Sequence, residues 1–358
     1  MYYERGKIMS MKVSVKNDKF NSGKEVQIFT LTNSNGMQVE AINWGATLTK
    51  VMVPDRYGNI ENVVLEWQDI DTYEKNPGCL GSTVGRVAGR IADAKVTLDN
   101  KEYNFVKNNA GNTLHGGLEG FHLKPWKASV KEEESEVSVT FTYLSLDGEE
   151  NFPGNLKASI TYTLKEDNSL TMTYEATTDK ETIVNMTNHA YFNLSGNAKR
   201  SVLDQEVFIN SSKICEGDSE LIPSGQYLSL AENKPFDFRE AKEIGKDISA
   251  DHIQLKYGNG YDHIWVLDEG DVSASLYDSA SGREMLVKTS APGVVMYSMN
   301  FADDDILLSS GNRQEVRYGV CFETQKKAIG RNEVFKDEVV LKTDENYRQV
   351  TTFLFKNR

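Results

Sequence analysis

The chain has 358 residues, of which 39% are hydrophobic and 10% aromatic, and it carries a formal net charge of −13. That length permits one large domain or two ordinary ones, and the apolar content is sufficient for a packed core. So negative a surface repels a phosphate backbone, so we expect no nucleic-acid partner.

The N-terminal stretch "MYYERGKIMSMKVSVKN" has no apolar run of the length that a signal peptide needs. No segment approaches the roughly 20 apolar residues of a membrane-spanning helix. We therefore expect a soluble, cytoplasmic protein that does not contact a membrane. Residues 1–12 are expected to form a loose extension. The sequence leaves the translation start open among three methionines: Met1, Met9 and Met11.

Alternation of apolar and polar residues recurs along the chain and predicts strands. Turn residues such as Asp99–Asn100, Glu166–Ser169 and Ser281–Gly282 divide several of these stretches into expected hairpins. The stretches with this pattern are 51–65, 96–105, 136–144, 158–177 and 274–289.

No segment of a dozen residues keeps a helical period between capping residues. Frequent strands separated by turns are typical of an antiparallel sandwich or barrel. There is no Pro/Ser-rich linker and no step in composition, so we predict an all-β protein with a single domain over residues 1–358.

Early in the chain, glycines precede two arginines in "VGRVAGRI", Arg86 and Arg90, without the spacing or following helix of a nucleotide fingerprint. "NTLHGGLEGFH" places His115 before two glycines, in a loop with little side-chain bulk. We assign no role to His122 or His252, which have polar neighbours in the sequence.

The segment "TNHAYFNLSG" contains one of only five histidines, His189. If residues 183–194 form one strand, the even positions make an apolar face. The odd positions, which include Asn185, His189 and Tyr191, make a polar and aromatic face without charge. Such a face suits a cleft for a hydroxylated ligand. A histidine satisfied by a buried amide network explains the pattern about equally well.

Two later strands carry acidic residues in apolar surroundings. "RYGVCFETQ" places Glu323 on one face with Cys321 and Gln325, and burying such a carboxylate is costly unless it is paired or used. In "GNGYDHIWVL", Asp262 lies at the mouth of an apolar strand, where an Asp is more often a turn former. A carboxylate and an imidazole from two strands could face one cleft.

The motifs together resemble the aldose 1-epimerase family, also called galactose mutarotases. They run in order along nearly the whole chain: "NWGATLTKVMVPDRYGN", "STVGRVAGRIADAKVTLDNKEYNF", "NTLHGGLEGFHLKPW", "DGEENFPGNL", "NHAYFNLSG", "GYDHIWVL", "CFETQ" and "YRQVTTFLF". Each motif alone has little specificity, but their order and spacing are specific.

The resemblance implies a large antiparallel β-sandwich with a sugar cleft, and interconversion of the α and β anomers of free aldoses of the glucose and galactose type. It implies catalytic roles for His189 and Glu323. Arg90, His115 and Asp262 would bind sugar hydroxyls. A free aldose would be the partner of a monomer or homodimer.

The chemistry needs a group that takes a proton from the anomeric hydroxyl and one that protonates the ring oxygen, and each typically contributes about 10²–10⁴-fold. Imidazole suits the second task because both of its forms are accessible near neutral pH. No electron or group is transferred, so we expect no cofactor and no metal. We also expect a gap between the carboxylate and the imidazole that admits a sugar ring.

Two positions depart from the family pattern. Gly89 stands where many members have asparagine, and Val295 where they often have glutamine. The preferred aldose is therefore open, and Asn185 or Gln325 could supply the missing contacts. The alternative functions are a non-catalytic carbohydrate-binding sandwich, a hexose-phosphate 1-epimerase using Arg86 for the phosphate, and a glycosidase with a second carboxylate.

Overall fold

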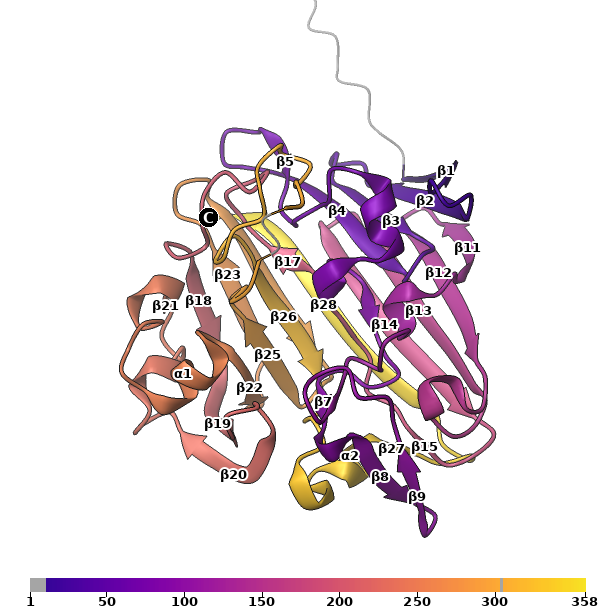
Figure 1. The fold of residues 1–358 in the computed structure, drawn as a ribbon. Coiled ribbons are helices and arrows are strands. Elements are labelled where there is room, and N and C mark those ends of the chain that lie inside the picture. The colour runs from indigo at the N-terminus through magenta and orange to yellow at the C-terminus, as the bar shows by residue number, and fades with distance from the viewer. Residues whose placement is uncertain (1–10, 303–304) are drawn as a thin grey trace, which may run out of the picture.

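The computed structural model describes residues 11–302 and 305–358, and these form stacked antiparallel sheets (Figure 1). The first ten residues of the expected N-terminal extension lie outside the described residues. The extension was expected to include residue 12, but Lys12 already pairs with Thr32 in the first strand.

The largest sheet has nine strands, and each is antiparallel to its neighbours. In spatial order they are β11 (Lys127–Glu132), β12 (Glu136–Ser145), β13 (Leu156–Lys165), β14 (Ser169–Thr178), β28 (Tyr347–Asn357), β24 (Arg283–Thr289), β23 (Ala274–Tyr277), β18 (Glu206–Ile209) and β21 (Lys242–Glu243).

A five-stranded sheet and a six-stranded sheet accompany it. The first contains β1 (Lys12–Lys19), β2 (Glu25–Thr32), β3 (Gln38–Ile42), β4 (Thr47–Pro54) and β5 (Ile60–Asn62). The second contains, in order, β17 (Tyr191–Phe192), β26 (Val320–Gln325), β25 (Gly293–Tyr297), β22 (Asp262–Leu267), β19 (Ser211–Gly217) and β20 (Pro223–Ser229).

Short two-stranded ladders and two short helices complete the described secondary structure, apart from 3-10 turns. The ladders pair β6 (Thr83–Val84) with β16 (Thr187–Asn188), β7 (Arg90–Ile91) with β10 (Thr113–Leu114), β8 (Lys95–Leu98) with β9 (Lys101–Asn104), and β15 (Thr182–Ile183) with β27 (Val340–Leu341). The helices are α1 (Ile253–Gly258) and α2 (Lys336–Val339). No helix among the described residues has the length and apolar character needed to cross a bilayer.

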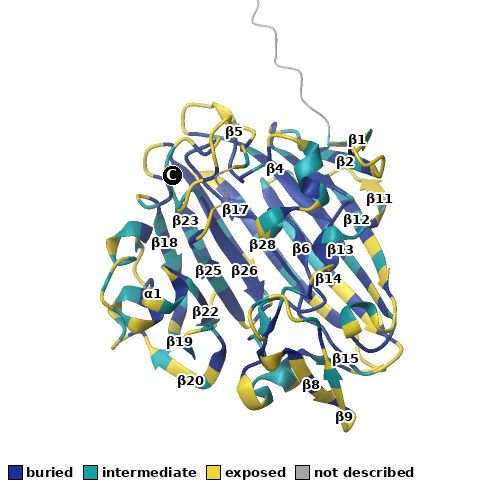
Figure 2. Cartoon of the chain, in the orientation of Figure 1, coloured by how far each residue is buried: buried dark blue, intermediate teal, exposed yellow. Residues whose placement is uncertain are grey.

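Both smaller sheets cover one face of the nine-stranded sheet. Phe29 of β2 packs against Phe141 of β12, with ring centroids 5.5 Å apart, and Phe192 of β17 packs against Phe353 of β28, at 5.1 Å. Phe141 and Phe353 point to the same side, because the register and the period-two alternation place them on one face. Burial is concentrated between these layers, and exposure at loops and outer strands (Figure 2).

The all-β prediction is confirmed, and the hairpins expected at 96–105, 158–177 and 274–289 are present. Antiparallel pairing suits such sheets because one face packs on the core while the other meets water. The prediction of a single domain over the whole chain stays a prediction.

The single strand expected over 183–194 was wrong. The segment contributes the short strands β15, β16 and β17 to three different ladders, and both of its faces are buried. Asparagine side chains interrupt the pairing: Asn188 donates to the Gly81 carbonyl and accepts from the Ala190 N–H. Such side-chain bonds to the backbone compete with a regular ladder.

Candidate active site

A cleft of about 470 Å³ lies over the six-stranded sheet. Its walls come from strands β22, β25 and β26, the segment around β17 and the loop that follows β10. All five residues that the sequence analysis selected line this cleft: Arg90, His115, His189, Asp262 and Glu323.

Strand pairing brings His189 beside Glu323. Glu323 lies within β26, and His189 lies between β16 and β17, just before Tyr191, which pairs with Cys321 of β26. The backbone at His189 is held from both sides, since its N–H donates to the Ser82 carbonyl and its own carbonyl accepts from Gly81. A conformation outside a regular strand is thus fixed by neighbouring backbone.

The second wall is built from β7 and β10. Arg90 and Leu114 are cross-strand partners in this ladder, so Arg90 and the following His115 lie close together. Gly116 has φ +86°, and a Cβ there would lie 2.0 Å from the Gly85 carbonyl oxygen. The loop can therefore carry His115 over the cleft only with a glycine next to it.

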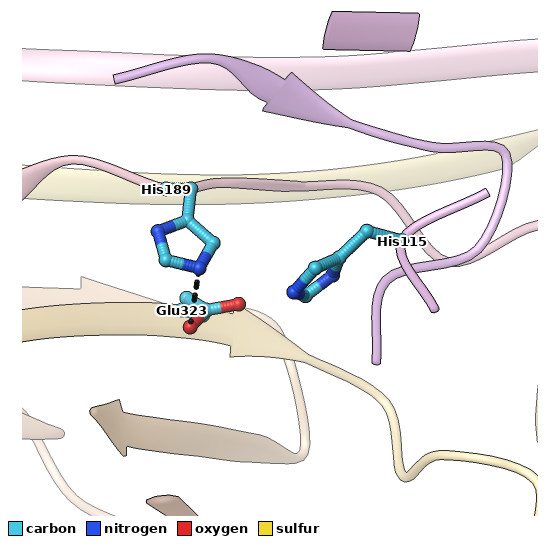
Figure 3. Close-up of side chains that lie close together, drawn as sticks. All are labelled: His115, His189 and Glu323. Atoms are coloured by element: carbon cyan, nitrogen blue, oxygen red, sulfur yellow. Dashed lines mark ion pairs between the residues drawn. The ribbon is translucent and has the colours of Figure 1, made fainter. Parts of the chain in front are cut away.

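His189 and Glu323 are in direct contact. Their Nε2 and Oε1 atoms lie 3.5 Å apart, and the side chains are only 7% and 4% exposed (Figure 3). The expected gap wide enough for a sugar ring was therefore wrong. The two reacting oxygens of an aldose are both bonded to the anomeric carbon, so an acid and a base that address them can be neighbours.

Burial moves the two pKa values of this pair apart. It raises the pKa of Glu323 to about 8, helped by the charge of Asp262 and opposed by Arg90. Burial also lowers the pKa of His189 to about 4. Both shifts follow because a low-dielectric site disfavours the charged form of each group. Between these values the pair holds one proton, on the carboxyl group, beside a neutral imidazole.

Contacts with three neighbouring side chains fix the orientation of the His189 ring. Its Nδ1 lies 3.5 Å from the Cys321 sulfur. The ring is tilted over Tyr191 at a centroid distance of 4.9 Å and stands perpendicular to His115 at 5.3 Å. Nε2 is consequently the nitrogen that faces Glu323.

His115 is placed as a hydrogen-bond donor. The Gly89 N–H donates to Nδ1 of His115 over 3.3 Å, and burial lowers the pKa of His115 well below its usual value. A neutral imidazole whose Nδ1 accepts carries its proton on Nε2. Figure 3 shows the His115 ring directed toward the His189–Glu323 pair. His115 can therefore donate to a ligand oxygen in the cleft.

Arg90 and Asp262 face each other across the cleft wall, with Nη2 and Oδ2 3.8 Å apart. Arg90 also donates from Nε to the side-chain oxygen of Asn109 over 3.3 Å. Burial raises the pKa of Asp262, and Arg90 opposes that shift. The pair presents both donors and acceptors, which suits a ligand rich in hydroxyl groups.

One cluster resembles a metal centre, but only in its distances: His115, His189 and Glu323. Their ligand atoms lie within 4.8 Å of one another, and two histidines with one glutamate are a known zinc set. A metal needs the lone pair of Nε2, however, and the bond from Gly89 to Nδ1 leaves the proton of His115 on Nε2. The donor set does not fit, so we derive no chemical step through a metal.

Comparison with known proteins identifies the family of this chain. The aldose 1-epimerase family model matches residues 27–354. Galactose mutarotase from Sus scrofa is 36% identical over 97% of this chain and 99% of its own length, and aldose 1-epimerase from Escherichia coli is 36% identical over 78% and 80%. The crystal structure of galactose 1-epimerase from Lactobacillus acidophilus superposes with a TM-score of 0.88, at 30% identity over 97% of this chain and 99% of that one.

The chain belongs to the aldose 1-epimerase family.

Some residues of the cleft, among them His122 and Tyr297, were not predicted from the sequence. His122 was given no role, yet it lines the cleft and is 8% exposed. No periodic pattern marks it, because it lies in the short 3-10 turn η4 (Phe121–Leu123). Tyr297 also lines the cleft, and its alternation with Val295 along β25 could have indicated this. His252 instead caps helix α1 by accepting from the Gln254 N–H.

The two departures from the aldose 1-epimerase pattern both lie in the cleft. Gly89 and Val295 line it, and Val295 is the cross-strand neighbour of Glu323. An aliphatic side chain therefore stands next to the buried carboxyl group. Neither residue can offer a side-chain hydrogen bond to a ligand.

Proposed function

We propose that this chain is an aldose 1-epimerase, an isomerase that interconverts the α and β anomers of free aldoses of the glucose and galactose type. The buried His189–Glu323 pair in a cleft that is also lined by Arg90, His115 and Asp262 is the observation that carries the proposal. Family membership over most of the chain gives independent support.

The reaction requires a balanced exchange of protons. Glu323 takes the proton of the anomeric hydroxyl while His189 delivers one to the ring oxygen, and the C1–O5 bond breaks to give the open aldehyde. Rotation about C1–C2 exposes the other face of the carbonyl. Ring closure then reverses both proton transfers, so no electron, group or net proton is left on the protein.

The pKa values describe the state from which this exchange starts. At neutral pH the single proton of the pair rests on Glu323, because burial raises its pKa to about 8 and lowers that of His189 to about 4. Transfer of this proton across the 3.5 Å contact creates the carboxylate and imidazolium that the proposed roles need. This proton transfer keeps the total charge of the site constant.

The remaining three residues hold the sugar. His115 donates from Nε2, Arg90 donates from its guanidinium group and Asp262 accepts. Together they position the ring so that its anomeric carbon faces the His189–Glu323 pair. Positioning of this kind removes much of the entropic cost of reaching the transition state.

No observation favours the rival activities. The Arg86 guanidinium, which a hexose-phosphate 1-epimerase could use, donates to Ser145 and to the Pro153 and Gly154 carbonyls and is 2% exposed. A glycosidase needs a second free carboxylate, but Asp262 is engaged by Arg90. A binding module without activity would have no use for the raised pKa of Glu323.

Cytoplasmic location and a monomer or homodimer are part of the proposal. Support for the location comes from three cysteines that are all free thiols, as is usual in a reducing compartment. Size-exclusion chromatography with light scattering measures the oligomeric state.

Polarimetry tests the activity directly. Freshly dissolved α-D-glucose and α-D-galactose should mutarotate much faster with the protein than without it. The matched Glu323→Gln variant should return the rate to near the uncatalysed value. Sugar binding by calorimetry without any acceleration would instead identify a carbohydrate-binding protein.

A further inference from the structure

Gln325 lies in the cleft close to Glu323 in the sequence. It follows Glu323 by two residues on β26, so both side chains point to the same face of the sheet. It lines the cleft and is only 2% exposed. Its cross-strand neighbour on β25 is Gly293.

The amide oxygen of Gln325 has no partner. Within residues 11–302 and 305–358, no donor forms a hydrogen bond to its buried Oε1 atom. A buried acceptor without a partner is unfavourable and is uncommon in folded proteins. A ligand hydroxyl in the cleft would satisfy it.

Asn185, the other amide that could replace the missing sugar contacts, already has a partner within the protein for both its nitrogen and its oxygen. Its Nδ2 donates to the Lys326 carbonyl over 3.0 Å, and its Oδ1 accepts from the Lys326 N–H over 2.9 Å. It holds the chain just after Gln325 and does not line the cleft. Of the two amides, only Gln325 is therefore available to a ligand.

Gly89 explains why the amide of Gln325 can lie where it does. A Cβ at position 89 would be 3.3 Å from Nε2 of Gln325 and 3.2 Å from the Ala328 side chain, closer than usual contacts. A side chain at position 89 would therefore compete with Gln325 for the same space. Gly89 also adjoins Arg90 and donates to His115, so this space is next to the sugar-binding wall.

We propose that Gln325 is a specificity-determining sugar contact, whose side-chain carbonyl accepts a hydrogen bond from one hydroxyl group of the bound aldose. In this chain the amide arrives from β26 and takes the place of one that position 89 lacks. The inference rests on the proposed function, because it names a further contact of the same substrate.

The first experiment replaces Gln325 with methionine, which has a similar length but no acceptor. KM for galactose should rise about 3- to 10-fold, as expected for one lost hydrogen bond, while kcat stays within about 2-fold. Thermal stability should not fall, because no bond within the protein is removed. The exposed Gln226→Met variant on β20 is the matched control and should behave like wild type.

Deoxy sugars separate a direct contact from a general distortion of the cleft. The wild type and Gln325→Met should differ in KM for most of 2-, 3-, 4- and 6-deoxygalactose. For the one sugar that lacks the partner hydroxyl, the two proteins should have equal KM values. The same KM ratio for all four sugars would overturn the proposal.

A complementary exchange tests the competition for space. Asparagine tolerates the positive φ of position 89, so Gly89→Asn should keep the loop intact while displacing Gln325 and raising KM. In a Gln325→Ala background, the same Gly89→Asn change should instead lower KM. An increase of KM in both backgrounds would refute the shared space.

Failure of this inference can be told from failure of the proposed function. A wild type that does not accelerate mutarotation rejects the proposed function. A wild type that turns over, with an unchanged KM in Gln325→Met, rejects only the role of Gln325.

Discussion

Removing the buried carboxyl group of Glu323, which we propose to be catalytic, should make the protein more stable at alkaline pH. Glu323 has its pKa raised by burial from an ordinary value of 4.5 to about 8. Between these values the folded state binds more protons at this site than the unfolded state, so the contribution of Glu323 to stability falls as pH rises from 4.5 to about 8. Glu323→Gln keeps the shape of the side chain and removes this penalty.

The size of the effect follows from the shift in the Glu323 pKa. A change of that size corresponds to at most about 5 kcal/mol above pH 8, and water reaching the cleft reduces it to about 2–4 kcal/mol. The entropy of unfolding grows with chain length, and for a chain of this length a change of 1 kcal/mol in the free energy of unfolding moves Tm by about 1.3 °C. We therefore expect Glu323→Gln to melt about 3–5 °C above wild type at pH 9.

Thermal unfolding between pH 4.5 and pH 9 measures the effect. The Tm difference between Glu323→Gln and wild type should be near zero at pH 4.5 and should grow toward pH 8. Glu175→Gln is the matched control, because Glu175 is exposed on β14 and should show no such trend. A variant that is no more stable than wild type at pH 9, or a difference that does not depend on pH, would refute the burial argument.

Three further outcomes are expected. Glu323→Gln and His189→Asn should each lower kcat by about 10²–10⁴-fold while sugar binding by calorimetry persists, and the losses should not add in the double variant because both groups serve one ring opening. The pH profile of kcat/KM should be bell-shaped with limbs near pH 4 and pH 8, since the active form of the His189–Glu323 pair holds one proton. A profile that is flat over this range would contradict this protonation state. Val295→Gln should lower KM for galactose by about 2- to 10-fold with little change in kcat, because the new hydrogen bond would form equally in the ground state and the transition state. A raised KM would mean that the cleft is built around valine.

Local patterns in the sequence were enough to predict much of the architecture. Alternation with turn residues at Asp99–Asn100 and Glu166–Ser169 predicted hairpins that the structure contains, because strand faces and tight turns depend on neighbouring residues. The same period of two placed Glu323 and Gln325 on one face of a strand, and both line the cleft. The choice of His189 and of the three residues that we propose to bind sugar needed the family motifs as well.

Contacts between distant segments decided the rest. Sequence alternation suggested one strand through His189, but Asn188 bonds to backbone and the segment divides among three ladders. The 3.5 Å contact between His189 and Glu323 depends on β17 pairing with β26, more than a hundred residues along the chain. No local pattern could show that the Asn185 amide forms hydrogen bonds with the backbone, while the Gln325 side-chain oxygen has no hydrogen-bond donor among the described residues. Burial, partner choice and pKa are properties of the packed neighbourhood, and that neighbourhood exists only once the sheets have come together.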